Sequence, residues 1–343
     1  MVERKYSLDL LRIFCCFCII ALHVSGHLPY GRYWLLVQGV VRPALWCFMT
    51  LSGYFLLSKP ITDWKEFYLK HLTHLLIPLF LYTFLYQCYY AGRFQISFKS
   101  VLGGDTIGHL WFVYELLALY LLTPFLQKML LALNNRGVFS FLALLFFFGR
   151  VVPILKNIGL PLGIPTELLG NCSLFFFVLG YALSVQKKTI RLSVLIPLGM
   201  VNILYIAYTL QNGILAPGAA DLSAGMVIGT LFYFFLFQKC FAWLERTCFI
   251  KRAVDFISGR TYGIYLIHML IFQIFTAREI MMLNPLSLSR YWMLPLKCVI
   301  IFLLGLAASI PLDLLICAPL QKGMMWLLCR IGISTKKKER MKP

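Results

Sequence analysis

The chain has 343 residues, of which 60% are hydrophobic and 13% are charged, and its formal net charge at pH 7 is +19. A soluble globular chain is nearer half apolar, with about a quarter of its residues charged, so this composition excludes an ordinary soluble domain. The basic residues lie mostly at the ends of apolar segments, which is typical of membrane orientation and predicts no nucleic-acid partner.

Apolar segments of membrane-spanning length recur along the whole chain, which predicts an all-α polytopic membrane protein held in the lipid bilayer. The loops between them are short, so residues 1–343 are expected to form one integral-membrane domain, with a short basic cytoplasmic tail from about residue 330. About ten transmembrane helices can be drawn, at 7–28, 35–57, 71–91, 109–131, 138–154, 167–185, 191–211, 221–243, 256–276 and 292–318.

The basic residues predict the orientation of these helices. With the N-terminus inside, 22 basic residues fall on the cytoplasmic side and nine on the outer side, and Arg12 lies within a span, which together account for all 32. Short loops on the cytoplasmic side carry the excess of Lys and Arg, so both termini are expected in the cytoplasm.

The first apolar segment carries Arg12 and His23, eleven residues apart. Eleven steps of about 100° bring a helix round to within roughly 20° of its start, so the two side chains share one face. His27, a further turn on, falls on nearly the same stripe. Ionisable groups inside a bilayer are costly and usually face a bundle interior or a wet cavity. We therefore interpret this stripe as functional; the alternative for Arg12 is a long side chain that reaches the inner surface.

Eleven cysteines are present, and Cys15, Cys16 and Cys18 lie together in this first segment. The chain has no CxxC pair with a matching partner pair, which argues against a zinc site or a disulfide framework. We expect the cysteines to be small core residues and expect no metal.

The third segment begins with Lys70, His71 and His74. The two histidines are about one helical turn apart, and with Lys70 they would form a basic collar suited to phosphate oxygens. The alternative is an ordinary positive flank of a transmembrane helix, which suits Lys70 better than it suits the histidines.

The fourth segment opens with His109 and Trp111, and Glu115 follows about one turn deeper, on nearly the same face as Trp111. A carboxylate inside the membrane needs a partner or water. Glu115 could be a base, a member of a proton relay, or a structural counter-ion to Arg42 or Arg150.

The ninth segment carries Tyr262, Tyr265 and His268 at steps of three residues. Each step drifts about 60° round the helix, so these side chains form a polar spiral. His268, near the middle of the membrane, is the strongest functional candidate of the three.

These motifs, in this order and over nearly the full length, resemble those of the acyltransferase-3 family. The motifs that carry the resemblance are Arg12 and His23 in the first span, residues 47–54 with Ser52-Gly53-Tyr54, residues 109–111, residues 120–124, residues 176–180 and residues 261–268. The family comprises membrane enzymes that move an acyl group from cytoplasmic acyl-CoA to extracytoplasmic glycans and related acceptors.

The resemblance implies a membrane O-acyltransferase of the bacterial cytoplasmic membrane. Its donor would be acetyl-CoA or another acyl-CoA, its acceptor a hydroxyl of a surface glycan or lipid-linked precursor, and polysaccharide-assembly proteins would be candidate partners. Arg12, Lys70, His71 and His74 would then bind the CoA phosphates. The expected catalytic residues are His23, Glu115 and His268, and the expected acceptor-side residues are His109, Trp111, Tyr262 and Tyr265.

One departure from the family pattern concerns the third span. Where the family usually shows an arginine pair, this chain has His71 and His74 ahead of Leu76-Ile77-Pro78. Imidazole is mostly neutral near pH 7, so donor binding here would be weaker or pH-dependent. The absence of a hydrolase-like domain after residue 315 predicts a stand-alone member.

Two other functions are open to this sequence. The intramembrane His and Glu residues could serve as a proton relay in a transporter or flippase for a lipid-linked sugar or small metabolite. A non-catalytic partner in polysaccharide assembly is the third hypothesis, and the His71/His74 departure is the feature that favours it.

Overall fold

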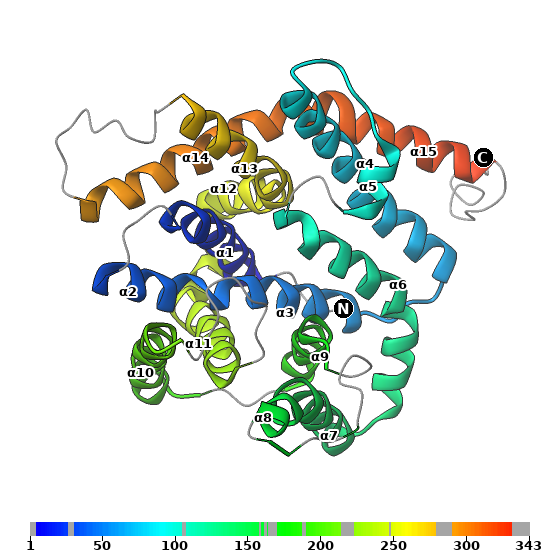
Figure 1. Cartoon of the computed structure of the whole chain (residues 1–343). Coiled ribbons are helices and arrows are strands. Elements are labelled where there is room, and N and C mark those ends of the chain that lie inside the picture. Colours follow the sequence, from blue (N-terminus) through cyan, green and yellow to red (C-terminus); the bar gives the residue numbers. More distant parts are fainter. Residues whose placement is uncertain are drawn as a thin grey trace.

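The computed structural model describes residues 5–26, 31–104, 108–157, 159–160, 163, 170–186, 190–213, 223–246, 248–278 and 290–330. Over these residues the chain is helical and has no strand, which confirms the all-α fold (Figure 1). The predicted tail beyond residue 330 and His27 lie outside the described residues. The elements are α1 (Tyr6–Ser25), α2 (Arg32–Val41), α3 (Pro43–Leu57), α4 (Trp64–Ala91), α5 (Phe98–Gly103), η1 (Gly108–Leu110), α6 (Trp111–Ala132), α7 (Asn135–Phe146), η2 (Phe147–Val151), α8 (Val152–Asn157), α9 (Cys172–Val185), α10 (Leu192–Gln211), α11 (Ala224–Cys240), η3 (Ala242–Arg246), α12 (Cys248–Ser258), α13 (Thr261–Ala277), α14 (Arg290–Leu312), η5 (Asp313–Cys317) and α15 (Ala318–Arg330).

Ten apolar helical stretches coincide with the ten predicted segments. Within the described residues, seven are long and apolar enough to cross a membrane, and the three shorter apolar helices are α9, α11 and α13. The chain is therefore a multi-pass membrane protein, while the count of ten spans stays a prediction.

Two of the differences from the predicted segment boundaries bear on the site. The third helix begins at Trp64 rather than at 71, because Asp63 caps α4 by accepting a 3.1 Å hydrogen bond from the Glu66 amide. The ninth segment is broken: α12 ends at Ser258 and α13 begins at Thr261, whose hydroxyl donates to the Ser258 carbonyl at 2.8 Å. His71 consequently lies two turns inside α4, and α13 is shorter than predicted.

Contacts between distant segments agree with the predicted alternation of helix directions. The Tyr33 hydroxyl donates to the Tyr291 carbonyl at 3.0 Å, and both residues belong to the predicted outer side. The Lys128 ammonium lies 4.7 Å from the centroid of the Trp64 ring, and both belong to the predicted inner side. Residues predicted for one side are thus found together, and the charge pattern remains the basis for naming that side cytoplasmic.

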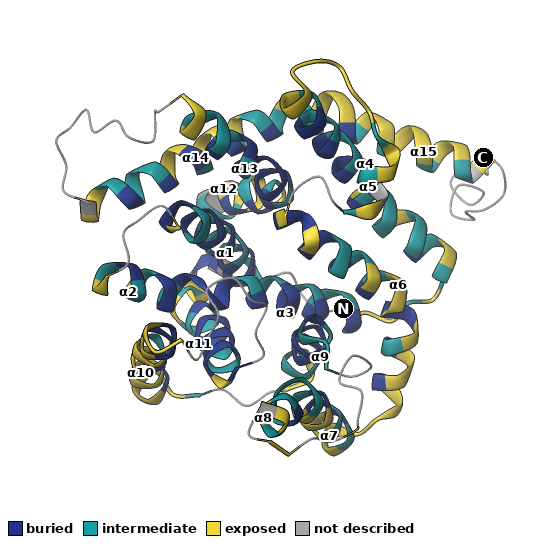
Figure 2. Cartoon of the chain, viewed as in Figure 1, coloured by how far each residue is buried: buried dark blue, intermediate teal, exposed yellow. Residues whose placement is uncertain are grey.

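The first helix lies at the centre of the bundle, with α2, α3, α11, α12, α13 and α14 packed around it (Figure 1). In the most apolar 18-residue stretch of α1, 61% of the residues are buried. The corresponding share in the helical stretch Asn135–Lys156 is 22%. Exposed apolar side chains gather on peripheral helices such as α10 and α15, where a lipid-facing surface is expected (Figure 2). Cys15, Cys16 and Cys18 are buried free thiols, as predicted.

Two glycines allow α3 and α9 to approach each other closely. A Cβ atom on Gly53 would lie 1.8 Å from the Phe177 carbonyl oxygen, and one on Gly180 would lie 2.0 Å from the Thr50 carbonyl oxygen. Small residues allow membrane helices to bring their backbones together. The motif at residues 52–54 of α3 therefore packs directly on the motif at residues 176–180 of α9, and this contact fixes α3 against the bundle.

Replacing Gly180 by alanine is expected to destabilise the fold by about 1–3 kcal/mol or more, because backbone atoms cannot rotate out of the way. The thermal unfolding midpoint in detergent measures this change. Gly323 is the matched control, because it lies in α15 with open space beside it, and alanine there is expected to stabilise the helix slightly. Equal midpoints for the two variants would contradict this account of the α3–α9 contact.

Candidate functional site

A cavity of about 530 Å³ opens between α1, α3, α4, α6, α13 and the stretch from η5 to α15. Helices from both ends of the chain form its wall, so no single motif builds it. The polar residues among those lining it are Arg12, Ser52, His71, His74, Tyr120, Ser258, Arg260, Thr261, Tyr262, Tyr265, Asp313 and Gln321. Four of them are arginine or histidine, so the cavity suits an anionic ligand.

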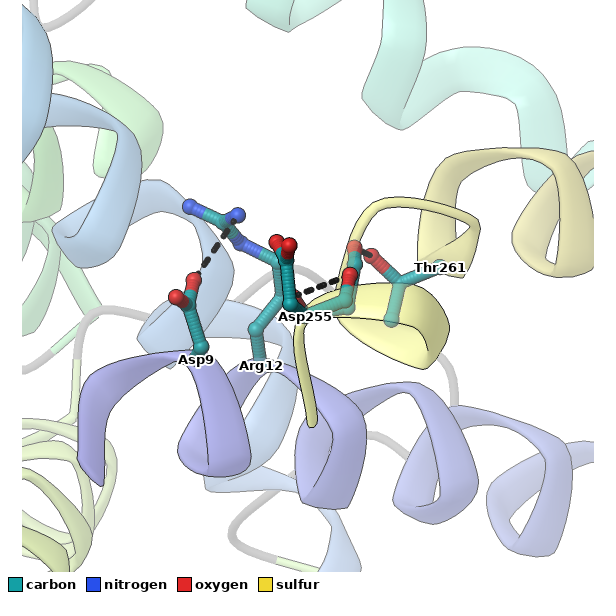
Figure 3. A network of polar contacts seen from close by, with 5 residues as sticks. Asp9, Arg12, Asp255 and Thr261 are labelled. Atoms are coloured by element: carbon teal, nitrogen blue, oxygen red, sulfur yellow. Dashed lines mark hydrogen bonds and ion pairs between the residues drawn. The ribbon is translucent and has the colours of Figure 1, made fainter. Parts of the chain in front are cut away.

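Arg12 projects from α1 into this cavity. Its guanidinium lies 3.5 Å from the buried Asp9 carboxylate and 5.4 Å from the centroid of the Phe55 ring. Figure 3 shows Arg12 and Asp9 on α1, beside Asp255 of α12 and Thr261 at the start of α13. The ion pair and the ring restrict the Arg12 side chain, which keeps its charge at the predicted inner mouth of the cavity.

The predicted collar on α4 is only partly assembled in the cavity. His71 and His74 line it, and the His71 ring lies 4.5 Å from the Phe67 ring and 5.9 Å from the Tyr120 ring between centroids. The Nδ1 of His74 lies 2.7 Å from the Lys70 carbonyl oxygen, so Nδ1 carries the hydrogen and Nε2 is the free nitrogen. Lys70 itself lines a second cavity of about 320 Å³, which shares His71 with the first.

Two tyrosines of α13 line the main cavity and join this helix to its neighbours. The Tyr262 hydroxyl donates to the Leu75 carbonyl at 2.8 Å, which joins α13 to α4. The Tyr265 hydroxyl donates to the His109 carbonyl at 2.5 Å, which joins α13 to η1. Tyr265 is therefore the residue through which the cavity contacts the next group of side chains.

Behind Tyr265 lie three histidines from three different elements, His23 of α1, His109 of η1 and His268 of α13. Their ring centroids are 5.4 Å apart for His23 and His268, 5.0 Å for His109 and His268, and 6.2 Å for His23 and His109. The Tyr265 ring lies 5.6 Å from His109 and 5.7 Å from His268. Sequence spacing singled out each histidine separately, and only the packing of the helices brings them together.

The histidine cluster contains ring nitrogens that can take a proton. The Nδ1 of His268 lies 2.5 Å from the Tyr265 carbonyl oxygen and must donate, which leaves Nε2 as the free nitrogen. That Nε2 is buried without a hydrogen-bond partner in the described structure. Buried polar atoms are normally paired, so this nitrogen is expected to meet a ligand or a reacting group. No three potential ligands in the described ranges are placed to hold a metal ion.

Trp111 and Glu115 lie apart from the cavity lining. Trp111 is 38% exposed at the start of α6. The Glu115 carboxylate accepts a 3.1 Å hydrogen bond from the Asn171 amide, and Asn171 also caps α9 through the Leu174 amide. Glu115 thus contacts the residue that caps α9. This hydrogen bond does not support the predicted catalytic role of Glu115.

Two charged residues of the lining, Arg260 and Asp313, are not among the site residues predicted from the sequence. Arg260 stands immediately before the Thr261–His268 motif and is one of the 22 basic residues predicted for the cytoplasmic side. Asp313 lies near the end of the last apolar segment, and an acidic residue within such a segment is the signal that could have identified it.

The family model described as an acyltransferase domain, that of the acyltransferase-3 family, matches residues 5–314 of this chain. The chain belongs to the acyltransferase-3 family. The match confirms the resemblance drawn from the motifs, and it supports an acyltransferase embedded in a membrane by multiple helices. No curated protein and no solved structure showed a significant match.

The family's motifs have separable tasks in this member. Gly53 and Gly180 pack α3 on α9, and Ser52, next to Gly53, lines the cavity. Tyr262 and Tyr265 hold α13 against its neighbours, while Arg12 reaches the cavity and His23 reaches the histidine cluster. The motifs at the two ends of the chain thus meet in one connected site.

Proposed function

We propose that this protein transfers a short acyl group, most simply acetyl, from acyl-CoA to a hydroxyl of a surface glycan or of its lipid-linked precursor. The observation that carries the proposal is the cavity with Arg12, His71 and His74 in its lining. Tyr265 belongs to the same lining and contacts His109 and His268 of the histidine cluster. Such a cavity fits a long ligand with phosphates at one end and a reacting group at the other.

The donor would enter from the cytoplasmic side of a bacterial cytoplasmic membrane. Arg12 offers a guanidinium, a strong donor to phosphate oxygens, and His71 and His74 offer further nitrogens. The arginine pair usual in the family is replaced here by these histidines, so Arg12 and Arg260 are the permanently charged side chains of the lining. Lys70 lines the adjoining cavity, so it would contact only a donor that extends past His71.

The chemical step needs a base and a good leaving group. The acceptor oxygen attacks the thioester carbonyl, the C–S bond breaks, and the hydroxyl proton passes through a histidine to the departing CoA sulfur. A neutral imidazole suits this proton transfer, and His23 is the histidine on the same helix as Arg12. Alternatively the His23 nitrogen takes the acyl group first and then yields it to the acceptor. In either case His109 and His268 lie next to His23 and position the reacting groups.

Membranes that contain the protein should transfer label from acetyl-CoA to a glycan fraction, and membranes without it should not. Mass spectrometry of surface glycans from cells with and without the protein then identifies the acylated hydroxyl. Uptake of a lipid-linked sugar into vesicles without acyl-CoA would instead support a transporter. Failure of the purified protein to bind acyl-CoA would favour a non-catalytic role.

A further inference from the structure

Asp313 is the single acidic side chain among the described residues that line the main cavity. It opens η5, a π-helical segment between α14 and α15 in the last apolar stretch. A carboxylate in such a stretch is costly to keep, and π-helical turns frequently occur at functional sites. Both features indicate that Asp313 serves the site.

The carboxylate lines the cavity beside α13. A Cβ atom built on Gly263 would lie 3.5 Å from the Asp313 Oδ2 and 3.0 Å from the Tyr82 hydroxyl. The same Cβ atom would lie 2.9 Å from the Ser309 Cβ, so Gly263 allows α14 and η5 to pack closely on α13. The Asp313 carboxylate is thereby held beside Tyr262 and Tyr265 in the lining of the cavity. Asp313 makes no hydrogen bond or ion pair with another residue in the described part of the chain.

Arg260 offsets the charge of Asp313 only in part. Its guanidinium acts electrostatically on Asp313, but it donates to the Phe256 carbonyl at 2.8 Å and stacks 3.8 Å from the centroid of the Phe256 ring. Arg260 is also the residue before α13, about one turn nearer the inner mouth than Gly263. A donor with its phosphates at the mouth would engage Arg260 there and carry its acyl end past Asp313 toward Tyr265.

We propose that Asp313 makes the site selective for short uncharged acyl groups, and that it excludes acyl groups ending in a carboxylate, such as succinyl. A second carboxylate in this partly apolar cavity would meet the like charge of Asp313. An acetyl group carries no charge and meets no such repulsion. This inference rests on the proposed function, because it assumes an acyl-CoA donor in the cavity.

Equilibrium binding of acetyl-CoA and succinyl-CoA to the full-length protein in detergent tests the inference without requiring turnover. The wild type is expected to bind succinyl-CoA about tenfold more weakly than acetyl-CoA. In Asp313→Asn the two dissociation constants should come within about twofold of each other, because the like charge is gone. A wild-type ratio near one, or a ratio unchanged in Asp313→Asn, would overturn the selectivity role while leaving the donor assignment intact.

Two further variants separate charge from shape. Asp313→Glu keeps the carboxylate and should retain the discrimination, even if Asp313→Asn folds poorly. Gln321→Ala changes an uncharged residue of the same lining and should leave the ratio at the wild-type value. Loss of discrimination in Asp313→Glu or in Gln321→Ala would contradict a charge mechanism. Binding of neither acyl-CoA would remove the proposed donor itself, and the selectivity role with it.

Discussion

Replacing His23 by alanine is expected to lower acyl transfer from acetyl-CoA by about 10²–10⁴-fold, which is the contribution of a positioned general base. The expectation follows from the place of His23 in the histidine cluster, 5.4 Å from His268 and 6.2 Å from His109 between ring centroids. A single-turnover assay with labelled acetyl-CoA in membranes measures the loss. Transfer undiminished in His23→Ala would remove this residue from the reaction.

The matched control is His27→Ala, since the sequence places this histidine one turn further on the same stripe. His27→Ala is expected to retain most of the transfer activity. The same assay without acceptor separates two roles of His23. Label that stays on the wild-type protein and is lost in His23→Ala indicates an acyl carrier, whereas an unlabelled protein indicates a base.

Replacing Arg12 by alanine is expected to raise the KM for acyl-CoA by about 10- to 100-fold, with a smaller change in kcat. One charge-assisted hydrogen bond to a phosphate contributes about 1.5–3 kcal/mol, and the Arg12 guanidinium reaches the cavity beside Asp9. Steady-state rates over a range of acetyl-CoA concentrations give the two constants separately.

Arg12→Lys should fall between the wild type and alanine, because lysine keeps the charge but loses the planar fork. Lys65→Ala is the matched control, since Lys65 is an exposed cation on α4 that lines neither cavity. A KM for Arg12→Ala equal to that of Lys65→Ala would show that Arg12 does not bind the donor.

The sequence alone determined the fold class and the position of the ten apolar segments, because an apolar stretch long enough to cross a bilayer forms a helix there. It also placed Arg12 and His23 on one face, since the period of a helix is fixed by its backbone hydrogen bonds. Both results are local properties of the chain. The motifs further identified the family, which the match over residues 5–314 confirms.

Only the tertiary structure decided which side chains meet. The rotation of each helix about its axis is set by packing, such as the approach of Gly53 and Gly180, and spacing along one helix contains no information about it. Packing gathered His23, His109 and His268 behind Tyr265 and turned Lys70 into a neighbouring cavity. It likewise placed Asp313 of η5 in the lining of the cavity beside Gly263 of α13, although these residues are far apart in the chain.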